Sequence, residues 1–255
     1  MRAECSNDVD NHFLKVIIPT YNSEQTLEVA LDSVEKLKGN AKVIIVDGGS
    51  TDSTLQIVER YSHIVELCIS EKDDGVYDAM NKSLKLLSSD DRCIFLGSDD
   101  RLVITRDELI KILDESKKNA CHIYGDVLID NKQRYDGEFN KFKIAVKNIC
   151  HQAIIYNVDI LMKNGSFYDL RYKIWGDWDL NIKNFHDMRY FPITVSIYSS
   201  AGLSGGNSDC VFIKEKSSIV KKHLGIASYI YMNIYEVLKG LAPERIKKIL
   251  RKNNV

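Results

Sequence analysis

Short apolar runs alternate with segments of helical period over the first 100 or so residues, and this alternation constrains the fold more than any other feature. Four apolar runs end near Asn22, Asp47, Ser70 and Asp100, and each is followed by apolar residues spaced three or four positions apart. Repeated strand-then-helix units are typical of β-α-β crossovers around a mainly parallel sheet. We therefore expect a doubly wound α/β domain that binds its ligands at the carboxyl ends of the strands.

The expected elements follow from these runs. In the first half we expect strands at 15–22, 41–47, 64–70 and 93–100, and helices at 23–37 with Ser23 as N-cap, at 51–61, at 75–87 and at 108–118. The second half is less regular: strand or hairpin segments at 122–130 and 135–142, a short helix at 177–187 and a strand at 190–200. No internal repeat or low-complexity linker is present, so one compact unit over 13–210 with a C-terminal helical extension over 211–255 is expected.

Charge and composition exclude some classes of function. The 255 residues carry a formal net charge of −1, which gives no reason to expect a nucleic-acid partner. The polar, acidic N-terminus does not fit a signal peptide, no apolar run of about 18 residues predicts a spanning helix, and the six cysteines form no C-x-x-C pair. These features predict a protein of the cytosol.

The segment from Val211 onward departs from this balance. It holds ten Lys or Arg residues against three acidic ones, mixed with aromatic and aliphatic residues at helical spacing. Two interpretations stay open: a helix packed on the domain with a solvated basic face, or an amphipathic segment that rests on an anionic membrane surface.

Polar residues gather at the expected strand ends. Neither G-x-G-x-x-G nor G-x-x-x-x-G-K-[ST] follows any strand, which argues against a dinucleotide site or a P-loop. Carboxylates at these ends would repel a bare diphosphate, whereas a shared Mg²⁺ or Mn²⁺ would reverse that interaction. Since consecutive side chains of an extended segment point to opposite faces, Asp99 and Asp100 are not both expected to bind the metal.

Four segments together carry a family resemblance. "VIIPTYN", "VIIVDGGSTDST", "EKDDGVYDAMNKS" and "FLGSDD" resemble, in order and spacing, the signature segments of family 2 glycosyltransferases. The resemblance runs from about Lys15 to Asp100 and continues more weakly through "HQA", "GDWDL" and "AGLSGG" to about Gly206. It implies the glycosyltransferase A fold and inverting transfer of a sugar from a nucleotide diphosphate donor, usually with a divalent metal. Residues 13–105 would then form the nucleotide-sugar half and 106–210 the acceptor half.

The resemblance also implies roles for individual donor-side residues. Tyr21 would stack on the base beside the wall formed by Pro19 and Thr20, with Glu24 near the nucleoside. Asp47 would accept a hydrogen bond from the base, which suits the N–H of uracil and therefore a UDP-sugar, and Gly48 and Gly49 would let the backbone turn beside the ligand. The remaining donor-side positions that match are Asp74, Gly75, Asp78 and Ser98.

For the metal and the base, the resemblance points to Asp99 and Asp177. "GSDD" occupies the place of the metal-binding D-x-D, with Asp99 as its last acid, but Gly97 stands where the first acid is often found. Asp177 in "IWGDWDL" matches the catalytic carboxylate, which takes the proton of the acceptor hydroxyl. The residues expected on the acceptor side are Trp175, Trp178 and His151, with Gln152 facing the same cleft and "AGLSGG" as a closing loop.

Other interpretations stand beside these. The two tryptophans could belong to the core, and Asp179 is interpreted as a solvated acid near a helix N-terminus. A first rival function is a sugar-nucleotide nucleotidyltransferase, although "PTYNSEQT" lacks the basic residue expected to hold a triphosphate. A second is a catalytically inactive nucleotide-sugar-binding scaffold. The preferred interpretation is a metal-dependent glycosyltransferase of surface polysaccharide or glycolipid assembly, with a sugar or lipid-linked sugar as acceptor, on or near the inner face of the membrane.

Overall fold

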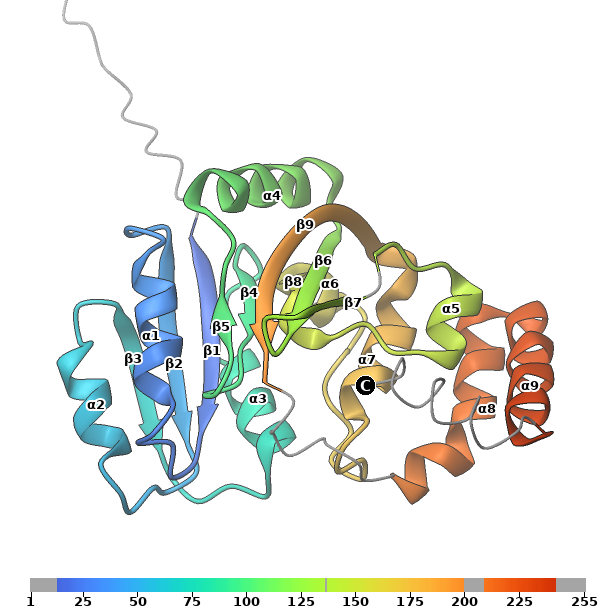
Figure 1. Cartoon of the computed structure of the whole chain (residues 1–255), viewed down its shortest axis with the longest axis horizontal. Coiled ribbons are helices and arrows are strands. Elements are labelled where there is room, and N and C mark those ends of the chain that lie inside the picture. The colour runs from blue at the N-terminus through green and yellow to red at the C-terminus, as the bar shows by residue number, and fades with distance from the viewer. Residues whose placement is uncertain (1–12, 136, 200–208, 242–255) are drawn as a thin grey trace, which may run out of the picture.

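The computed structural model describes residues 13–135, 137–199 and 209–241, and within these ranges helices cover a mixed sheet (Figure 1). The strands are β1 (Leu14–Thr20), β2 (Ala41–Asp47), β3 (Val65–Ser70), β4 (Arg92–Phe95), β5 (Arg101–Leu102), β6 (His122–Ile129), β7 (Gln133–Tyr135), β8 (Ile154–Asn157) and β9 (Met188–Tyr198). The α-helices are α1 (Leu27–Glu35), α2 (Thr54–Arg60), α3 (Val76–Leu84), α4 (Arg106–Asn119), α5 (Lys141–Val146), α6 (Val158–Lys163), α7 (Gly176–Asn184), α8 (Cys210–Leu224) and α9 (Ile226–Leu241).

The strand order places the loops that could bind a ligand. The described strands pair in the order β3-β2-β1-β4-β8-β6-β9-β5, with β7 on β6. The first four are parallel, and β8 then runs antiparallel to both β4 and β6. The chain moves outward from β1 to β3 and returns to the other side of β1 as β4, so the loops after β1 and β4 diverge and leave a crevice between them.

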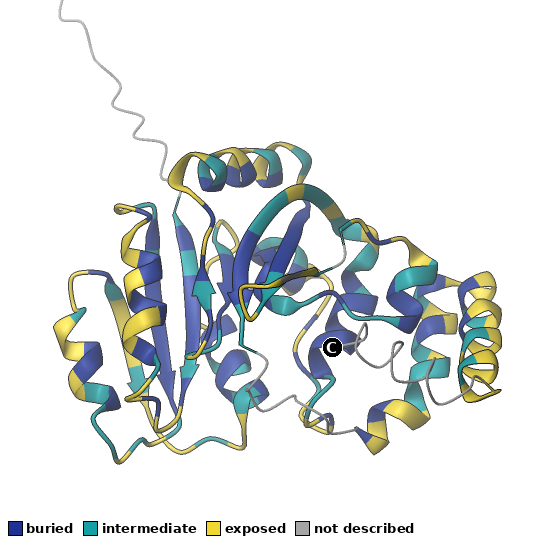
Figure 2. Cartoon of the chain, viewed as in Figure 1, coloured by how far each residue is buried: buried dark blue, intermediate teal, exposed yellow. Residues whose placement is uncertain are grey.

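Burial explains why these segments form strands and helices. β2 reads AKVIIVD, and its pattern of nearly continuous burial is that of a parallel strand covered on both faces. Figure 2 shows the same for the central strands, whose ribbons are mostly dark blue. One hydrophobic cluster joins α1, α2 and α4 to one face of the sheet, and a second joins α3, α7 and α8 to the other. The predicted doubly wound α/β fold with C-terminal helices is confirmed.

The predicted start of the first helix is wrong by one turn. α1 begins at Leu27 rather than at Ser23. The Ser23 amide donates to Thr54 Oγ1 at 2.7 Å and its hydroxyl lies 2.8 Å from Ser98 Oγ, so these groups join two other loops instead of capping a helix.

The segment 135–142 is also only partly a strand. β7 ends at Tyr135, and Asn140 accepts hydrogen bonds from the amides of Phe142 and Lys143, which starts α5. Asn is a preferred N-cap, so Asn140 is a signal for a helix start that the sequence carries beside its alternating pattern.

The C-terminal helices share the core of the domain. Phe212 and Val220 of α8 and Met232 of α9 are buried in the same cluster as α3 and α7. Asp209 ties this region down: its carboxylate accepts from the amides of Lys173, Ile174 and Phe212. The division into two halves and a separate extension stays a prediction. Of the helices in the described ranges, none combines the length and apolar character that crossing a bilayer needs.

The helix α4 provides a test of the local rules. The Thr105 hydroxyl accepts from the Glu108 amide at 3.3 Å, and the Glu108 carboxylate accepts from the Thr105 amide at 2.9 Å. Because this capping box satisfies two amides at the helix start, Thr105→Ala should lower the free energy of unfolding by about 1 kcal/mol, measured by urea denaturation. Thr105→Ser keeps the hydroxyl and is the control. An equal loss in both variants would contradict the capping explanation.

Candidate functional site

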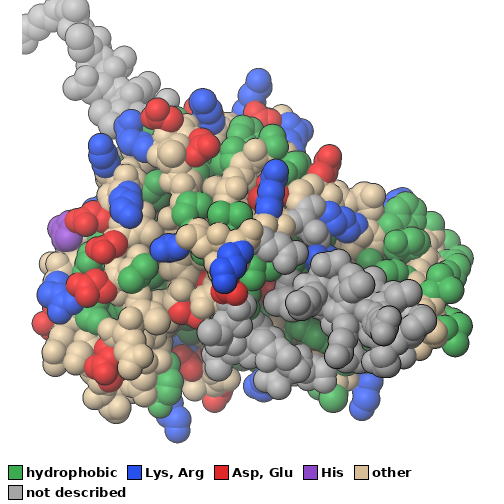
Figure 3. All heavy atoms as spheres, viewed as in Figure 1, with side chains coloured by type: hydrophobic (Ala, Val, Ile, Leu, Met, Phe, Trp, Pro, Cys, Tyr) green, Lys and Arg blue, Asp and Glu red, His purple; other side chains and the backbone are tan. Residues whose placement is uncertain are grey.

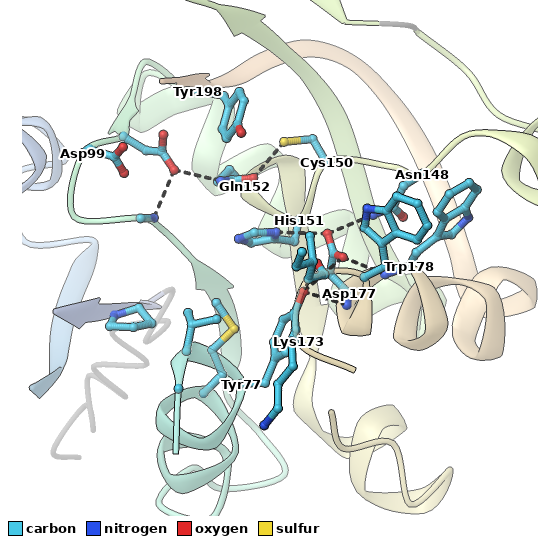
Figure 4. A pocket seen from close by; sticks show the side chains of 18 of the residues that line it. Tyr77, Asp99, Asn148, Cys150, His151, Gln152, Lys173, Asp177, Trp178 and Tyr198 are labelled. Carbon is cyan, nitrogen blue, oxygen red and sulfur yellow. Dashed lines mark hydrogen bonds and ion pairs between the residues drawn. The ribbon is translucent and has the colours of Figure 1, made fainter. Parts of the chain in front are cut away.

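A single large cleft lies at the carboxyl ends of β1 and β4 and extends to α8 and α9 (Figure 4). Its volume is about 1490 Å³, enough for a nucleotide sugar together with part of an acceptor. Twelve of the predicted site residues line it: Pro19, Thr20, Tyr21, Glu24, Gly75, Ser98, Asp99, His151, Gln152, Trp175, Asp177 and Trp178. The predicted residues that do not line it are Asp47, Gly48, Gly49, Asp74 and Asp78.

The donor-side wall is built from the loops after β1 and β4. The hydrogen bond between Ser23 and Ser98 holds these two loops together at the switch point. Tyr21 is 65% exposed, which is unusual for an aromatic residue next to a buried strand. Its ring is therefore available to stack on a ligand, and stacking on a base stays a prediction.

Asp47 has a structural environment. It is fully buried and accepts hydrogen bonds from Thr20, Gly49, Ser70 and both the amide and the hydroxyl of Ser50. Although burial opposes ionisation, these hydrogen bonds hold the pKa of Asp47 below its ordinary value. Asp47 thus fixes the turn after β2, and the predicted hydrogen bond to a base would require one of these donors to move.

The segment "EKDDG" contributes a different acid from the one expected. Asp73 lines the cleft, while Asp78 accepts from the amide of Asp74 and pairs with Lys82. A β-carbon at Gly48 would lie 2.8 Å from Asp73 Oδ2, so the glycine lets this carboxylate approach the backbone. The family resemblance pointed to Asp74 and not to Asp73, and no local signal separates these adjacent acids before Gly75.

The turn after β4 separates its two acids. Asp99 is exposed in the cleft, whereas Asp100 is buried and accepts from Gln152, from the amide of Ser199 and from that of Gly97. Burial raises the pKa of the Asp100 carboxyl, and the neighbouring charge of Asp99 also favours the rise. The predicted divergence of the two acids is therefore observed, but they lie in a turn and not on an extended strand.

Gly97 is explained by this turn. A β-carbon there would lie 2.5 Å from Asp100 Oδ2 and 2.9 Å from Asp99 Oδ1. An acid at position 97 would therefore clash with the two carboxylates that follow it. The departure from the family pattern is thus a packing requirement of this particular turn.

The residues present fit a metal held jointly with a nucleotide. Within the described ranges, no group of three or more His, Cys, Asp or Glu side chains is arranged to hold a metal ion by itself. Asp99 offers an exposed carboxylate, and Mg²⁺ commonly binds through one or two carboxylates together with phosphate oxygens and water. Of the two acids in this turn, Asp99 could contribute in this way, because Asp100 is already committed to its hydrogen bonds.

Asp177 lies at the start of α7 among groups that orient its carboxylate. Oδ2 accepts from Asn148 Nδ2 at 2.8 Å and lies 3.2 Å from His151 Nδ1, and Oδ1 accepts from the Trp178 amide at 2.8 Å. Tyr77 hydroxyl is 3.4 Å from Oδ1, but its one proton is donated to the Ile174 carbonyl. Oδ1 therefore keeps capacity to accept a further hydrogen bond.

The acceptor-side aromatics are partly core and partly cleft. Trp178 is buried and donates to the Ile144 carbonyl at 2.8 Å, and Trp175 packs edge-on against it. Both nevertheless line the cleft. In Figure 4, His151 lies beside Asp177; its Nδ1 must carry the proton that bonds to the carboxylate, which leaves Nε2 for a ligand.

The sequence interpretation of Asp179 as a solvated acid is wrong. It is fully buried and pairs with Lys183 at 2.5 Å, one helical turn later. Burial raises its pKa, against the effect of Lys183. The i, i+4 partner could have signalled this pair, but burial of a polar α7 face depends on contacts from distant segments.

Other cleft residues were not identified from the sequence. Asn148 and Tyr77 surround Asp177, and Lys216 of α8 lies over the Trp178 ring. Tyr77 lies inside the family segment "EKDDGVYDAMNKS", which gave it no role, and no quoted motif contains Asn148 or Lys216. The predicted closing loop "AGLSGG", 201–206, lies outside the described residues.

Comparison with known proteins agrees with this arrangement. The family described as "Glycosyl transferase family 2" matches residues 15–200. A PGL/p-HBAD biosynthesis glycosyltransferase of Mycobacterium tuberculosis is 36% identical over 213 residues, which cover 78% of this chain and 82% of that protein. The Escherichia coli protein WfgD, a UDP-Glc:alpha-D-GlcNAc-diphosphoundecaprenol beta-1,3-glucosyltransferase, is 29% identical over 155 residues, covering 60% of this chain and 58% of that one.

Solved structures show the same fold. Residues 1–349 of Staphylococcus aureus TarS in complex with UDP-GlcNAc align with a TM-score of 0.63 and 19% identity, over 83% of this chain and 71% of that one. The longer TarS structure is covered to 43%. The mannosyltransferase PcManGT of Pyrobaculum calidifontis, in complex with GDP-Man and Mn2+, aligns with a TM-score of 0.55 and 17% identity, over 93% and 68%.

These matches bear on the two rival functions. The matching family and the curated relatives are glycosyltransferases. This favours a glycosyltransferase over a nucleotidyltransferase or an inactive scaffold. The chain belongs to glycosyl transferase family 2 and is a glycosyltransferase with the glycosyltransferase A fold.

Proposed function

We propose that this glycosyltransferase transfers a sugar from a UDP-sugar to a hydroxyl group of a lipid-linked acceptor, with inversion at the anomeric carbon. One observation carries the proposal: a single cleft exposes Asp99 at the switch point of the sheet and holds Asp177 at its other wall. A donor diphosphate and an acceptor hydroxyl would thus meet between two carboxylates with separate tasks.

The donor would lie against the loops after β1 and β4. The exposed ring of Tyr21 offers a stacking surface for the base, and Pro19, Thr20 and Ser98 line the same wall. Asp47 would act indirectly, by holding the turn at Gly49 and Ser50. UDP is favoured over other nucleotides by the resemblance, and TarS has been solved with UDP-GlcNAc.

The metal would be held by Asp99 together with the donor diphosphate. A divalent cation, Mn²⁺ or Mg²⁺, supplies charge neutralisation to the departing diphosphate when bound. Asp99 positions that charge at the switch point, and the half-buried acids Asp52 and Asp73 in the same wall make an uncompensated diphosphate unfavourable there. The neighbour PcManGT was solved with Mn2+.

Asp177 would act as the base. Asn148 and His151 hold Oδ2, so the carboxylate is oriented before the acceptor arrives, and Oδ1 can accept the hydrogen bond of the acceptor hydroxyl. As the new bond forms at the anomeric carbon and the bond to the diphosphate breaks, the hydroxyl proton passes to Asp177. A single displacement of this kind inverts the configuration. Trp175 and Trp178 would contact the acceptor sugar beside it.

The setting of the reaction is proposed from relatives. Their names place them in PGL/p-HBAD biosynthesis and in transfer to a diphosphoundecaprenol-linked sugar. We extend this to an acceptor in surface glycolipid or polysaccharide assembly, presented at the inner face of the membrane. No nucleic acid enters this proposal, since the net charge is −1.

The helix α9 would rest on that membrane. Figure 3 shows hydrophobic side chains gathered at the right margin, where Figure 1 places α9. These side chains form an outward apolar face on α9. The segment from Val211 onward supplies the excess of basic residues that an anionic headgroup layer attracts. The exposed large apolar residues of this α9 face are Ile226, Ile230, Tyr231, Ile234, Val237, Leu238 and Leu241.

The metal assignment has a thermal test. UDP with Mn²⁺ at about 100 times the dissociation constant should raise the midpoint of unfolding by roughly 5–10 °C, and Asp99→Ala should abolish the gain due to Mn²⁺. Mn²⁺ without UDP should have little effect, because the described residues form no complete metal site. Asp107→Ala, an exposed acid on α4, is the matched control. A parental response in Asp99→Ala would exclude this residue as ligand.

The base assignment separates binding from transfer. Asp177→Asn keeps the size of the side chain and should still show the UDP and Mn²⁺ stabilisation, while the rate of sugar transfer falls by about 10²–10⁴-fold. Product formation is measured by chromatography with a panel of UDP-sugars and lipid-linked acceptors. Full activity in the variant would mean that another group takes the proton.

The membrane contact is tested by vesicle binding. The double variant Ile234→Gln/Leu238→Gln should reduce partitioning onto vesicles of phosphatidylglycerol and phosphatidylethanolamine by about tenfold or more, measured by sedimentation. Val29→Gln/Leu86→Gln, which removes two exposed apolar residues on α1 and after α3, should bind like the parent. If α9 instead pairs with a second copy, the parent would be dimeric without lipid and the double variant monomeric.

A further inference from the structure

The α8–α9 wall of the cleft contains a cation that the proposed mechanism does not use. Lys216 lies on α8, lines the cleft, and has a side chain that is only 12% exposed. Its Nζ is 3.9 Å from the centroid of the Trp178 ring and 3.9 Å from Glu236 Oε1. The latter distance is too long for a hydrogen bond. Within the part of the chain that the structure describes, Lys216 has an ion pair and a ring contact but no hydrogen-bond acceptor.

An ammonium in this position is energetically unusual. It carries three donors, and a charge removed from water is normally paired and hydrogen-bonded. Burial is the main cause that lowers the pKa of Lys216 to about 8; the nearby Glu236 opposes this shift, and the positive charge of Lys239 on α9 contributes to it. Lys216 on α8 and Lys239 on α9 therefore repel one another in this wall of the cleft, with Glu236 as the nearby acid. An anion between them would relieve this repulsion.

The charges of the cleft divide into two ends. The wall formed by the β1, β2, β3 and β4 loops presents acids, and the wall formed by α7, α8, α9 and the segments before α7 presents lysines. The acids of the sheet wall are Glu24, Asp52, Asp73 and Asp99. The helical wall holds four lysines, Lys147, Lys173, Lys216 and Lys239, against two acids, Asp177 and Glu236. An anionic group is thus favoured at the helical end without a metal ion.

Lys216 is also near the proposed base. Trp178 directly follows Asp177 on α7, and the Lys216 ammonium lies over the Trp178 ring. An acceptor sugar whose hydroxyl approaches Asp177 would extend along this tryptophan toward Lys216. Lys239 and Lys216 both line the cleft, and α9 carries its exposed apolar residues on the face opposite to Lys239.

We propose that Lys216, with Lys239 beside it, binds a phosphate group of the acceptor, so that the acceptor is an anionic, phosphate-bearing glycan or lipid. This rests on the proposed function, because it takes Asp177 to mark the acceptor side. The donor diphosphate is the other phosphate in the reaction. It is assigned to the opposite end, where Asp99 requires a cation to hold it.

The experiment uses the full chain with the donor site saturated by UDP and Mn²⁺. Octyl phosphate and octyl β-glucoside, both below their micelle-forming concentrations, are titrated by calorimetry. Octyl phosphate should bind more tightly than the glucoside, and Lys216→Met should weaken the phosphate by about tenfold or more while leaving the glucoside unchanged. Methionine keeps an apolar chain over the Trp178 ring, so the loss reports the charge.

Two further variants complete the design. Lys216→Arg keeps the positive charge and should bind octyl phosphate within a few-fold of the parent. Lys222→Met, an exposed lysine of the same helix outside the cleft lining, should match the parent. Lys239→Met should also weaken octyl phosphate, which keeps the test available if the Lys216 variant does not fold.

The outcomes distinguish this proposal from the one before it. Equal binding of phosphate and glucoside, or no effect of either lysine variant, would overturn the phosphate site and leave the glycosyltransferase mechanism intact. If Lys216→Met weakens UDP itself and not octyl phosphate, the lysine serves the donor and the acceptor assignment is wrong. The titration is repeated without nucleotide, so the lysine result can be read even if UDP proves not to be the donor.

Discussion

The arrangement of the cleft depends on β1 and β4 lying side by side. Their parallel pairing from Leu14 to Ile17 is buried on both faces, so it cannot shift without exposing the core. The loops that follow must diverge at the edge of the sheet, and the Ser23–Ser98 hydrogen bond sets their separation. Tyr21 and Asp99 are 78 positions apart in the sequence, too far for any local interaction to bring them together. They lie in the same cleft because of this backbone constraint.

Burial decides which acids are structural and which remain available. Asp99 and Asp100 are neighbours, yet only Asp99 is exposed, because Gln152 and two amides hold Asp100 inside. Asp177 and Asp179 differ in the same way: Asp177 lines the cleft, while Asp179 is buried against Lys183. The Asp100 carboxylate supports the turn that presents Asp99 by accepting from two backbone amides, whereas Asp179 pairs with the side chain of Lys183. The sequence alone does not show which acid of each pair is buried and which is exposed to the cleft.

The sequence allowed the order of strands and helices in the first half to be predicted, because their apolar periods are local. The family segments also identified Tyr21, Asp99 and Asp177, which the structure brings to one cleft. Ser23 and Asp47 were assigned less well: the bonds of Ser23 and most of those of Asp47 come from loops distant in sequence or from their own turn. Nothing in the sequence indicated that Lys216 lines the cleft, because its position there involves contact with Trp178, 38 positions earlier in the chain.

The opposite charges of the two ends give the cleft a direction. A nucleotide diphosphate at the helical end would meet lysines but no exposed ring like that of Tyr21, and at the sheet end it meets the ring but needs a cation beside Asp99. An acceptor phosphate has the reverse preference, since it needs no metal beside Lys216. Because Asp177 belongs to the helical wall and Asp99 to the sheet wall, each substrate would present its reacting atom to the space between them only when bound in one orientation. The helix α9 turns Lys239 toward the cleft and its exposed apolar residues away from it, so the lysine end of the cleft is also the end of the domain nearest to the proposed membrane contact.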